Sequence, residues 1–167
     1  MAPSEPGVRP RVTVRPAAAA DADAIAAIWY AGWRDGHLGH VPAELVAVRT
    51  EESFWTRAGE QIADATVAVV DDQVAGFVMV VGDEVEQVYV GRDHRGSGVA
   101  ATLLAEAERQ VKANGHGTAW LAVATGNARA RRFYERNGWT DDGAFDYQAP
   151  AGRGTLPVPC HRYVKPV

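Results

Sequence analysis

The sequence has few of the features that mark secreted, membrane-spanning or nucleic-acid-binding proteins. Cys160 is its only cysteine, so no disulfide can form within the chain, as is typical of a reducing compartment. No apolar run reaches the length of a membrane-spanning helix, and the proline-containing N-terminus lacks the apolar segment of a secretory signal. We therefore expect a cytoplasmic protein without a membrane partner.

Basic residues are not in excess either. The 17 Lys and Arg residues are outnumbered by 21 Asp and Glu, which gives a net charge of -4. A nucleic-acid-binding surface usually needs clustered positive charge, so no nucleic-acid partner is expected. His37 and His40 have no third ligand nearby in the sequence, and no metal site is expected. Otherwise the 167 residues are 47% hydrophobic, which is ordinary for one globular domain.

The hydrophobic pattern predicts an α/β domain over residues 11–167 that follows a flexible tail at 1–10. Apolar residues at a spacing of two predict strands over 11–15, 66–70, 74–81, 84–90, 119–124, and near 139–146 and 158–164. Helical spacing and capping residues predict helices after Asp21, around 54–62, over 99–114, and from Asn127 to Asn137. Gly36, Gly39 and Pro42 predict an irregular connection after the first helix.

The order of these elements predicts a mixed sheet. The crossover helix makes strands 84–90 and 118–124 parallel, whereas hairpins make the other neighbours antiparallel. The fold is therefore expected to be a mostly antiparallel sheet with a central parallel pair and flanking helices. Val85 is apolar, and so are Val88 and Val90, so the alternation changes parity within this strand. A bulge near 86–88 would return both halves to the core face and leave one amide unpaired, and a strand buried on both faces is the alternative.

A glycine-containing loop, Arg95-Gly96-Ser97-Gly98-Val99-Ala100, joins a strand to a helix. The glycines permit a tight turn with inward amides, and the helix start adds positive dipole, so the loop suits a pyrophosphate. Arg92 and Arg95 add charge. A Walker loop is excluded because no Lys follows the last glycine, and a dinucleotide fold would need an acid at the end of the next strand, where 124–127 has none. A plain strand-to-helix turn is the structural alternative.

With these residues, the chain resembles the GCN5-related N-acetyltransferase family. The family's cofactor motif, Gln/Arg-x-x-Gly-x-Gly/Ala, is matched by Arg95, Gly98 and Ala100. Residues 88–90 look like the family strand whose backbone pairs with the pantetheine arm. The block from Asn127 through Phe133-Tyr134-Glu135 to Gly138-Trp139 resembles the helix that follows. The resemblance covers roughly residues 11–165, and it departs at Asp93-His94, where many members carry a proline in the loop.

This resemblance implies a transfer of acetyl from acetyl-CoA, as cosubstrate, to a primary amine by direct attack in a ternary complex. The acceptor would be a small molecule or a peptide, and a homodimer is compatible with such folds. A non-catalytic CoA-binding regulatory domain is the alternative. The implied cofactor-binding residues are Val88, Tyr89, Val90, Arg95, Gly96, Ser97, Gly98, Val99, Ala100 and Asn127. Asn127 is alternatively only a helix cap.

The same resemblance suggests two catalytic residues. Glu84 stands six residues before Val90, which is the spacing of the glutamate base in the family's histone-acetylating members; Glu86 and water are the alternatives. Tyr134 occupies the position of the acid that protonates the departing thiolate. The structural alternative for either glutamate is an exposed charge at a strand edge. The structural alternative for Tyr134 is a packed tyrosine of an amphipathic helix.

Overall fold

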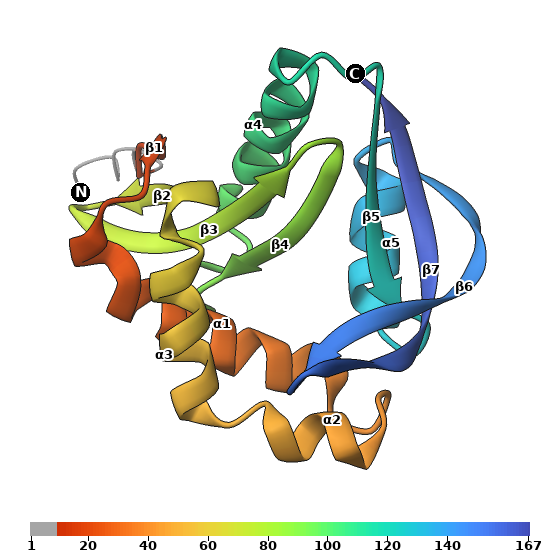
Figure 1. The fold of residues 1–167 in the computed structure, drawn as a ribbon. Coiled ribbons are helices and arrows are strands. Elements are labelled where there is room, and N and C mark those ends of the chain that lie inside the picture. Colours follow the sequence, from red (N-terminus) through yellow and green to blue (C-terminus); the bar gives the residue numbers. More distant parts are fainter. Residues whose placement is uncertain (1–9) are drawn as a thin grey trace, which may run out of the picture.

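The protein forms a seven-stranded sheet with helices on both faces (Figure 1). It is described by a computed structural model over residues 10–167, so nearly all of the expected tail at 1–10 lies outside the described residues. The strand order is β1-β2-β3-β4-β5-β7-β6. The elements are β1 (Thr13–Pro16), α1 (Ala22–His37), α2 (Ala43–Val48), α3 (Glu51–Glu60), β2 (Ala65–Val70), β3 (Gln73–Val81), β4 (Glu84–Val90), α4 (Val99–Ala113), β5 (Thr118–Ala124), α5 (Ala128–Arg136), β6 (Thr140–Ala151) and β7 (Gly154–Pro166).

The predicted mixed α/β fold and its parallel strand pair are confirmed. Strands β4 and β5 are parallel, and the other neighbouring strands are antiparallel. Within the described chain, β4 and β5 share a single residue pair, Glu84 with Trp120. Beyond that pair the two strands run apart (Figure 1). The remainder of β4 therefore has a partner strand on its β3 side alone.

The predicted bulge in β4 is also present. Met79 pairs with Gln87, whereas the next residue of β3, Val80, pairs with Val85. Glu86 is the extra residue, so the strand changes parity there. Val85 is buried in the core, and Val88 and Val90 pack against the same core. The bulge thus explains the change of parity. Tyr89 packs against the core on the other face, so β4 has apolar contacts on both faces after the bulge.

Two hydrophobic cores lie on opposite faces of the sheet. Beneath α4 and α5, the core includes Leu103 and Leu104 together with strand residues of β2 to β5. On the other face, α1 and α3 bring Trp29 and Phe54 onto Phe77 of β3. The Trp29 and Phe54 rings meet edge to face with their centres 5.6 Å apart. Each such buried side chain contributes about 1.5–3 kcal/mol, so these contacts hold both helical layers to the sheet.

Helix α1 is longer than predicted. It continues through Gly36 to His37, where an irregular connection was expected. A Cβ at Gly32 would lie 2.4 Å from Cδ1 of Tyr89, and one at Gly36 would lie 2.8 Å from Nδ2 of Asn127. These glycines remain helical despite their low propensity because they let α1 lie directly against β4 and the start of α5.

The expected cap at Asp21 is wrong in its detail. Its carboxylate accepts no bond from α1; it accepts one from the Ala18 amide over 2.7 Å and pairs with Arg15 over 2.7 Å. Asp21 therefore fixes the segment before the helix. Helix α3 begins instead with a working cap, since the Thr50 hydroxyl accepts from the Ser53 amide over 3.2 Å.

The connections also differ from the prediction in two places. The short helix α2 was not predicted, and the helical region expected around 54–62 is α3 followed by a 3-10 turn, Ile62–Asp64. Strands β6 and β7 continue to a tight hairpin at Ala151 and Gly154, where a loop was expected. Arg49, just after α2, donates to the Pro150 carbonyl oxygen of β6. Across residues 10–167, no helix is both long and apolar enough to span a membrane.

Candidate active site

A cavity of about 470 Å³ opens where β4 and β5 diverge. Its walls come from both strands and from α1, α3, α5, β6 and β7. It brings together five of the predicted site residues, namely Glu84, Val88, Tyr89, Asn127 and Tyr134. Val90 and Arg95 instead line a second hollow of about 220 Å³ at the other end of β4. The predicted residues therefore follow β4 from the large cavity to the glycine loop.

The β4 backbone presents polar groups along its open edge. The Gly91 amide donates to the Ala75 carbonyl oxygen over 2.8 Å, on the β3 side. Because the direction of amides alternates in an antiparallel pair, the Tyr89 amide faces β3 and those of Val88 and Val90 face the open edge. Backbone groups at such an edge need a partner, and an extended ligand that contains amides would supply it.

The glycine loop has the conformation that an anion site requires. Gly96 and Gly98 have φ angles of +77° and +84°, in the left-handed region. A Cβ at either position would meet no described atom within 4 Å, apart from its chain neighbours. Helix α4 begins at Val99, directly after Gly98. The unpaired amides of its first turn therefore lie beside open space, an arrangement that also occurs at helix starts that bind phosphate.

Two arginines of this region are not free cations. Arg92 and Arg95 each place a guanidinium nitrogen 2.9 Å from a carboxylate oxygen of Asp35 on α1. Hydrogen bonds from Arg95 and Arg92 hold the pKa of Asp35 below its usual range. The three charges together leave one net positive charge, not the two suggested by the sequence. Asp35 also ties α1 to the loop that precedes α4.

Two carboxylates of β4 line the large cavity beside the bulge. The Tyr147 hydroxyl of β6 donates to Oε1 of Glu84 over 3.1 Å. Burial, followed by the charge of Glu86, raises the pKa of Glu84 despite that bond. Burial and the charge of Asp64 likewise raise the pKa of Glu86, and Arg57 partly offsets the rise. Both carboxylates therefore hold a proton more readily than an exposed glutamate, which suits a general base.

Tyr134 of α5 also reaches the cavity. Its ring centre lies 6.2 Å from that of Trp139 and 6.1 Å from that of Tyr163. Among residues 10–167 its hydroxyl has no hydrogen-bond partner that would hold it away from a ligand. Burial raises the Tyr134 pKa well above its ordinary value, so the phenol keeps its proton. It can therefore donate a hydrogen bond at neutral pH, although burial also makes it a weaker acid than an exposed phenol.

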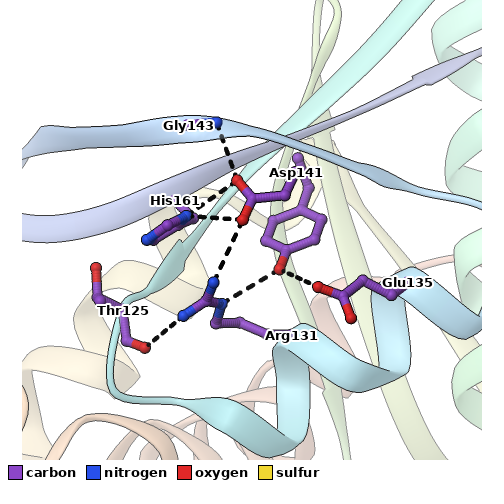
Figure 2. Close-up of polar contacts among 7 residues, drawn as sticks. Thr125, Arg131, Glu135, Asp141, Gly143 and His161 are labelled. Carbon is purple, nitrogen blue, oxygen red and sulfur yellow. Dashed lines mark hydrogen bonds and ion pairs between the residues drawn. The ribbon is translucent and has the colours of Figure 1, made fainter.

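A polar network anchors the helix that carries Tyr134 (Figure 2). Arg131 of α5 donates to the Thr125 carbonyl over 3.2 Å and to the Tyr163 hydroxyl over 3.2 Å, and it lies 3.3 Å from Asp141. These contacts give Arg131 a structural role. The Gly143 amide donates a hydrogen bond to the Asp141 carboxylate, and Nδ1 of His161 bonds to the same group. The Tyr163 hydroxyl donates to the Glu135 carboxylate.

Several cavity residues carry no local sequence signal. Arg49, Arg57, Asp64 and Tyr147 belong to no motif, and they meet only because their elements converge. Gly32 and Gly36, four residues apart on α1, are the one local pattern that indicates close packing of this helix against its neighbours. His37 also lines the cavity. It stacks on Trp33 with ring centres 5.0 Å apart, and burial lowers its pKa to about 4, so it is neutral.

Asn127 is a helix cap whose side chain also lines the cavity. Its side-chain oxygen accepts a bond from the Ala130 amide over 3.2 Å, which confirms the helix cap. The same side chain lines the cavity. Its amide nitrogen lies toward Gly36 of α1, which has no side chain to cover it. The cap therefore holds an NH₂ group in place beside the cavity.

Comparisons with known proteins agree with this geometry. The model of the acetyltransferase (GNAT) family matches residues 24–139. A GCN5-related N-acetyltransferase from Rhodopseudomonas palustris is 21% identical with a TM-score of 0.73, covering 98% of this chain and 100% of that one. PaiA N-acetyltransferase from Thermoplasma acidophilum, in complex with coenzyme A, is 18% identical with a TM-score of 0.72 over 94% and 99%. The putative acetyltransferase yncA from Salmonella typhimurium, with acetyl-CoA, is 18% identical with a TM-score of 0.68 over 93% and 94%. No curated protein matches the chain.

Proposed function

Because this chain belongs to the acetyltransferase (GNAT) family, we propose that residues 11–167 form one N-acetyltransferase domain that moves an acetyl group from acetyl-CoA to a primary amine. One observation carries the proposal. The open edge of β4 runs from a cavity that contains Glu84 and Tyr134 to a left-handed glycine loop at a helix start. A thioester, its amide-containing arm and its phosphates would meet these three features in that order.

The residues present fit acetyl-CoA as cosubstrate. One of the two open-edge amides, of Val88 or Val90, would pair with the pantetheine arm, which leaves the other for the reacting carbonyl. The Asn127 amide group would donate to the same arm. The amides of Arg95 to Ala100 would hold the pyrophosphate, since Gly96 and Gly98 leave open space above the backbone. A partner on the open β4 edge also satisfies backbone groups that would otherwise depend on water.

Acetyl transfer first requires a neutral amine. A lysine-like amine has a pKa of about 10.4, so only about one in 2,500 is neutral at pH 7, a cost of about 4.6 kcal/mol. Glu84, or its neighbour Glu86, takes this proton directly or through water. The raised pKa of each carboxylate brings its basicity closer to that of the amine. Such proton transfer is typically worth about 10²–10⁴ in rate.

Two further groups act as the carbon–nitrogen bond forms and the carbon–sulfur bond breaks. The amide of Val90 or Val88 on the open β4 edge stabilises the negative charge that develops on the carbonyl oxygen. Tyr134 gives its hydroxyl proton to the departing sulfur. The nitrogen loses two protons through the carboxylate, one from the ammonium before attack and one from the tetrahedral intermediate. The phenol recovers one proton from solvent, so the cycle yields the amide, the free thiol and one net proton.

The test is release of free CoA from acetyl-CoA in the presence of a panel of primary amines. We expect turnover with at least one amine and formation of its N-acetyl product, identified by mass. A non-catalytic CoA-binding domain would instead bind acetyl-CoA by calorimetry and release no CoA with any amine. That result would make the regulatory alternative the correct one.

A further inference from the structure

Two arginines line the large cavity without a carboxylate at ion-pair distance, although the charge of Glu86 is near enough to act on Arg57. Arg49 follows α2 and is only 8% exposed, and Arg57 lies on α3. Neither forms an ion pair with a carboxylate of residues 10–167. A buried cation without a counter-charge is costly, whereas one that meets an anionic ligand gains a strong interaction. An anionic ligand bound in the cavity would supply the missing counter-charge for both side chains.

The Arg57 guanidinium is held in place by aromatic rings, but its hydrogen-bond donors are not all used. Its central carbon lies 4.4 Å from the centre of the Trp29 ring and 5.6 Å from that of Phe54. Its Nη1 atom is buried and has no hydrogen-bond partner in the described part of the chain. Burial and the charge of Arg49 lower its pKa to about 10, so it remains charged at neutral pH. The rings cover one face of the guanidinium and leave its edge donors unused.

Arg49 extends this positive region. Its guanidinium makes one bond, to the Pro150 carbonyl oxygen. Its charge lowers the pKa of both Arg57 and His37, so all three groups share one part of the cavity. His37 is neutral and its Nδ1 lies 2.9 Å from the Trp33 carbonyl oxygen. This end of the cavity therefore carries two positive charges.

The β4 wall of the same cavity is acidic. Glu84 and Glu86 project from it, and Asp64 lies close enough to raise the pKa of Glu86. A polyamine would be attracted to this wall and repelled by the two arginines. A ligand with an amine and a carboxylate would instead match both ends. The planar donor edge of a guanidinium suits a carboxylate in particular.

We propose that the acceptor is an amino acid, whose amine faces Glu84 and Glu86 and whose carboxylate binds Arg57 and Arg49. This assignment rests on the proposed acetyl transfer for the identity of the amine end. The carboxylate end rests on the unpaired Arg57 donors and on the absence of a counter-charge for Arg49 among the described residues. Amines without an acidic group become poor acceptors, because they leave both guanidiniums unpaired in a filled cavity.

The first measurement is binding to the protein saturated with CoA. Calorimetry compares L-amino acids with their α-amides and with the amines formed by their decarboxylation, with β- and ω-amino acids as further probes. We expect at least one amino acid to bind at least tenfold more tightly than its amide, equivalent to about 1.4 kcal/mol. Equal binding of acid and amide throughout the panel would overturn the proposal.

The second measurement assigns the preference to the arginines. Arg57→Gln should raise KM for the preferred amino acid at least tenfold, with little change in kcat and in the KM of its amide. Arg57→Lys should lie between wild type and Arg57→Gln, because it keeps the charge and loses the planar donors. Arg109→Gln, on the exposed surface of α4, is the control and should behave as wild type. Arg49→Gln provides the same test if Arg57→Gln does not fold.

The outcomes separate this proposal from the proposed function. Turnover of amines without a carboxylate preference leaves acetyl transfer intact and shows that the acceptor assignment is wrong. Tight binding of amino acids without turnover of any amine supports the arginine site and overturns acetyl transfer. A carboxylate preference that Arg57→Gln and Arg49→Gln both retain would also overturn the assignment.

Discussion

The two parts of the cavity that we assign to the cofactor and to the acceptor, here called the cofactor side and the acceptor side, are built in different ways. The cofactor side comes from two short stretches, 84–100 and 127–134, and it offers mostly backbone groups on an open strand edge and at a helix start. The acceptor side is assembled from α1, α3, β6 and β7 with Arg49, and it offers charged side chains. Backbone groups serve a cosubstrate common to a whole family, whereas side chains can change with the acceptor.

Tyr134→Phe should have the largest effect, and it tests whether the cofactor side supplies chemistry as well as binding. The hydroxyl is proposed to act only as the sulfur departs, so its loss should lower kcat about 10²-fold or more. Acetyl-CoA affinity should stay within a few-fold of wild type. The melting temperature should hardly change, because the hydroxyl has no partner among residues 10–167. Steady-state kinetics, calorimetry and thermal melting measure the three quantities.

Tyr30→Phe is the matched control, since Tyr30 packs on Phe54 away from the large cavity. It should leave kcat unchanged. Full kcat in Tyr134→Phe would remove this tyrosine from the mechanism and leave water as the proton donor. The cofactor side would then contribute binding alone.

Glu84→Gln should have the next largest effect on turnover. It tests the position where the cofactor side meets the acceptor side. We expect turnover to fall by one to two orders of magnitude at pH 7 and by less at pH 9–10, where more of the amine is already neutral. The carboxylate acts when deprotonated, so wild-type kcat/KM should fall as pH drops through a pKa above the usual 4.3 of glutamate. The direction follows from the raised pKa of Glu84.

Two variants sharpen this assignment. Tyr147→Phe removes the hydrogen bond that lowers the Glu84 pKa, so the acidic limb of the profile should move to higher pH. Glu86→Gln should keep most activity if Glu84 is the base. A pH-dependent loss in Glu86→Gln with a normal profile in Glu84→Gln would move the role to Glu86. An equal loss at every pH would give Glu84 a structural role.

Gly98→Val should weaken acetyl-CoA binding at least tenfold, or about 1.4 kcal/mol, and it tests the backbone character of the cofactor side. Valine is strained at a φ of +84°, and its side chain would occupy the space above the loop. Gly115→Val controls for the strain, since Gly115 has a φ of +92° at the far end of α4. Calorimetry on folded proteins provides the comparison. Unchanged affinity in Gly98→Val would show that the pyrophosphate does not approach this loop.

Asp141→Asn should have the smallest effect, on stability, and it tests how firmly α5 is anchored. A hydrogen bond from His161, then one from the Gly143 amide, holds the Asp141 pKa below its usual range. A lowered folded pKa stabilises the fold above the unfolded value of about 3.9 and loses that effect as pH falls through the folded pKa. For so exposed an ion pair the effect is about 1 kcal/mol or less.

The melting temperature of Asp141→Asn should therefore lie about 2–4 °C below wild type at pH 7. The difference should shrink as the pH is lowered from about 4 toward 2, because wild-type Asp141 is then protonated. Asp146→Asn on the same strand is the control and should melt as wild type at both ends of this range. A constant difference at every pH would show that the carboxylate charge of Asp141 does not stabilise the fold.

Local patterns explain where prediction succeeded and where it failed. Alternation in β4 predicted both its bounds and its bulge, because burial of one face requires a fixed parity. Asn127 and Gly98 were recognised because cap and left-handed positions favour particular residues. Asp21 is also a residue type that is preferred at helix caps, yet its carboxylate binds Arg15 and the Ala18 amide and does not cap α1. Gly36 reads as a helix breaker locally, and only the nearby Asn127 side chain explains its place within α1.

The sequence by itself determined the order of the main elements other than α2, the parallel crossover and the glycine loop, since each depends on residues close together in the chain. Glu84 and Tyr134 were identified through the family resemblance. The tertiary structure alone decided that β4 and β5 separate after one residue pair, and that separation creates the cavity. It also decided that Asp35 pairs with two loop arginines and that Arg57 stays unpaired over Trp29. These features depend on contacts between residues distant in the chain, which packing sets and no local pattern encodes.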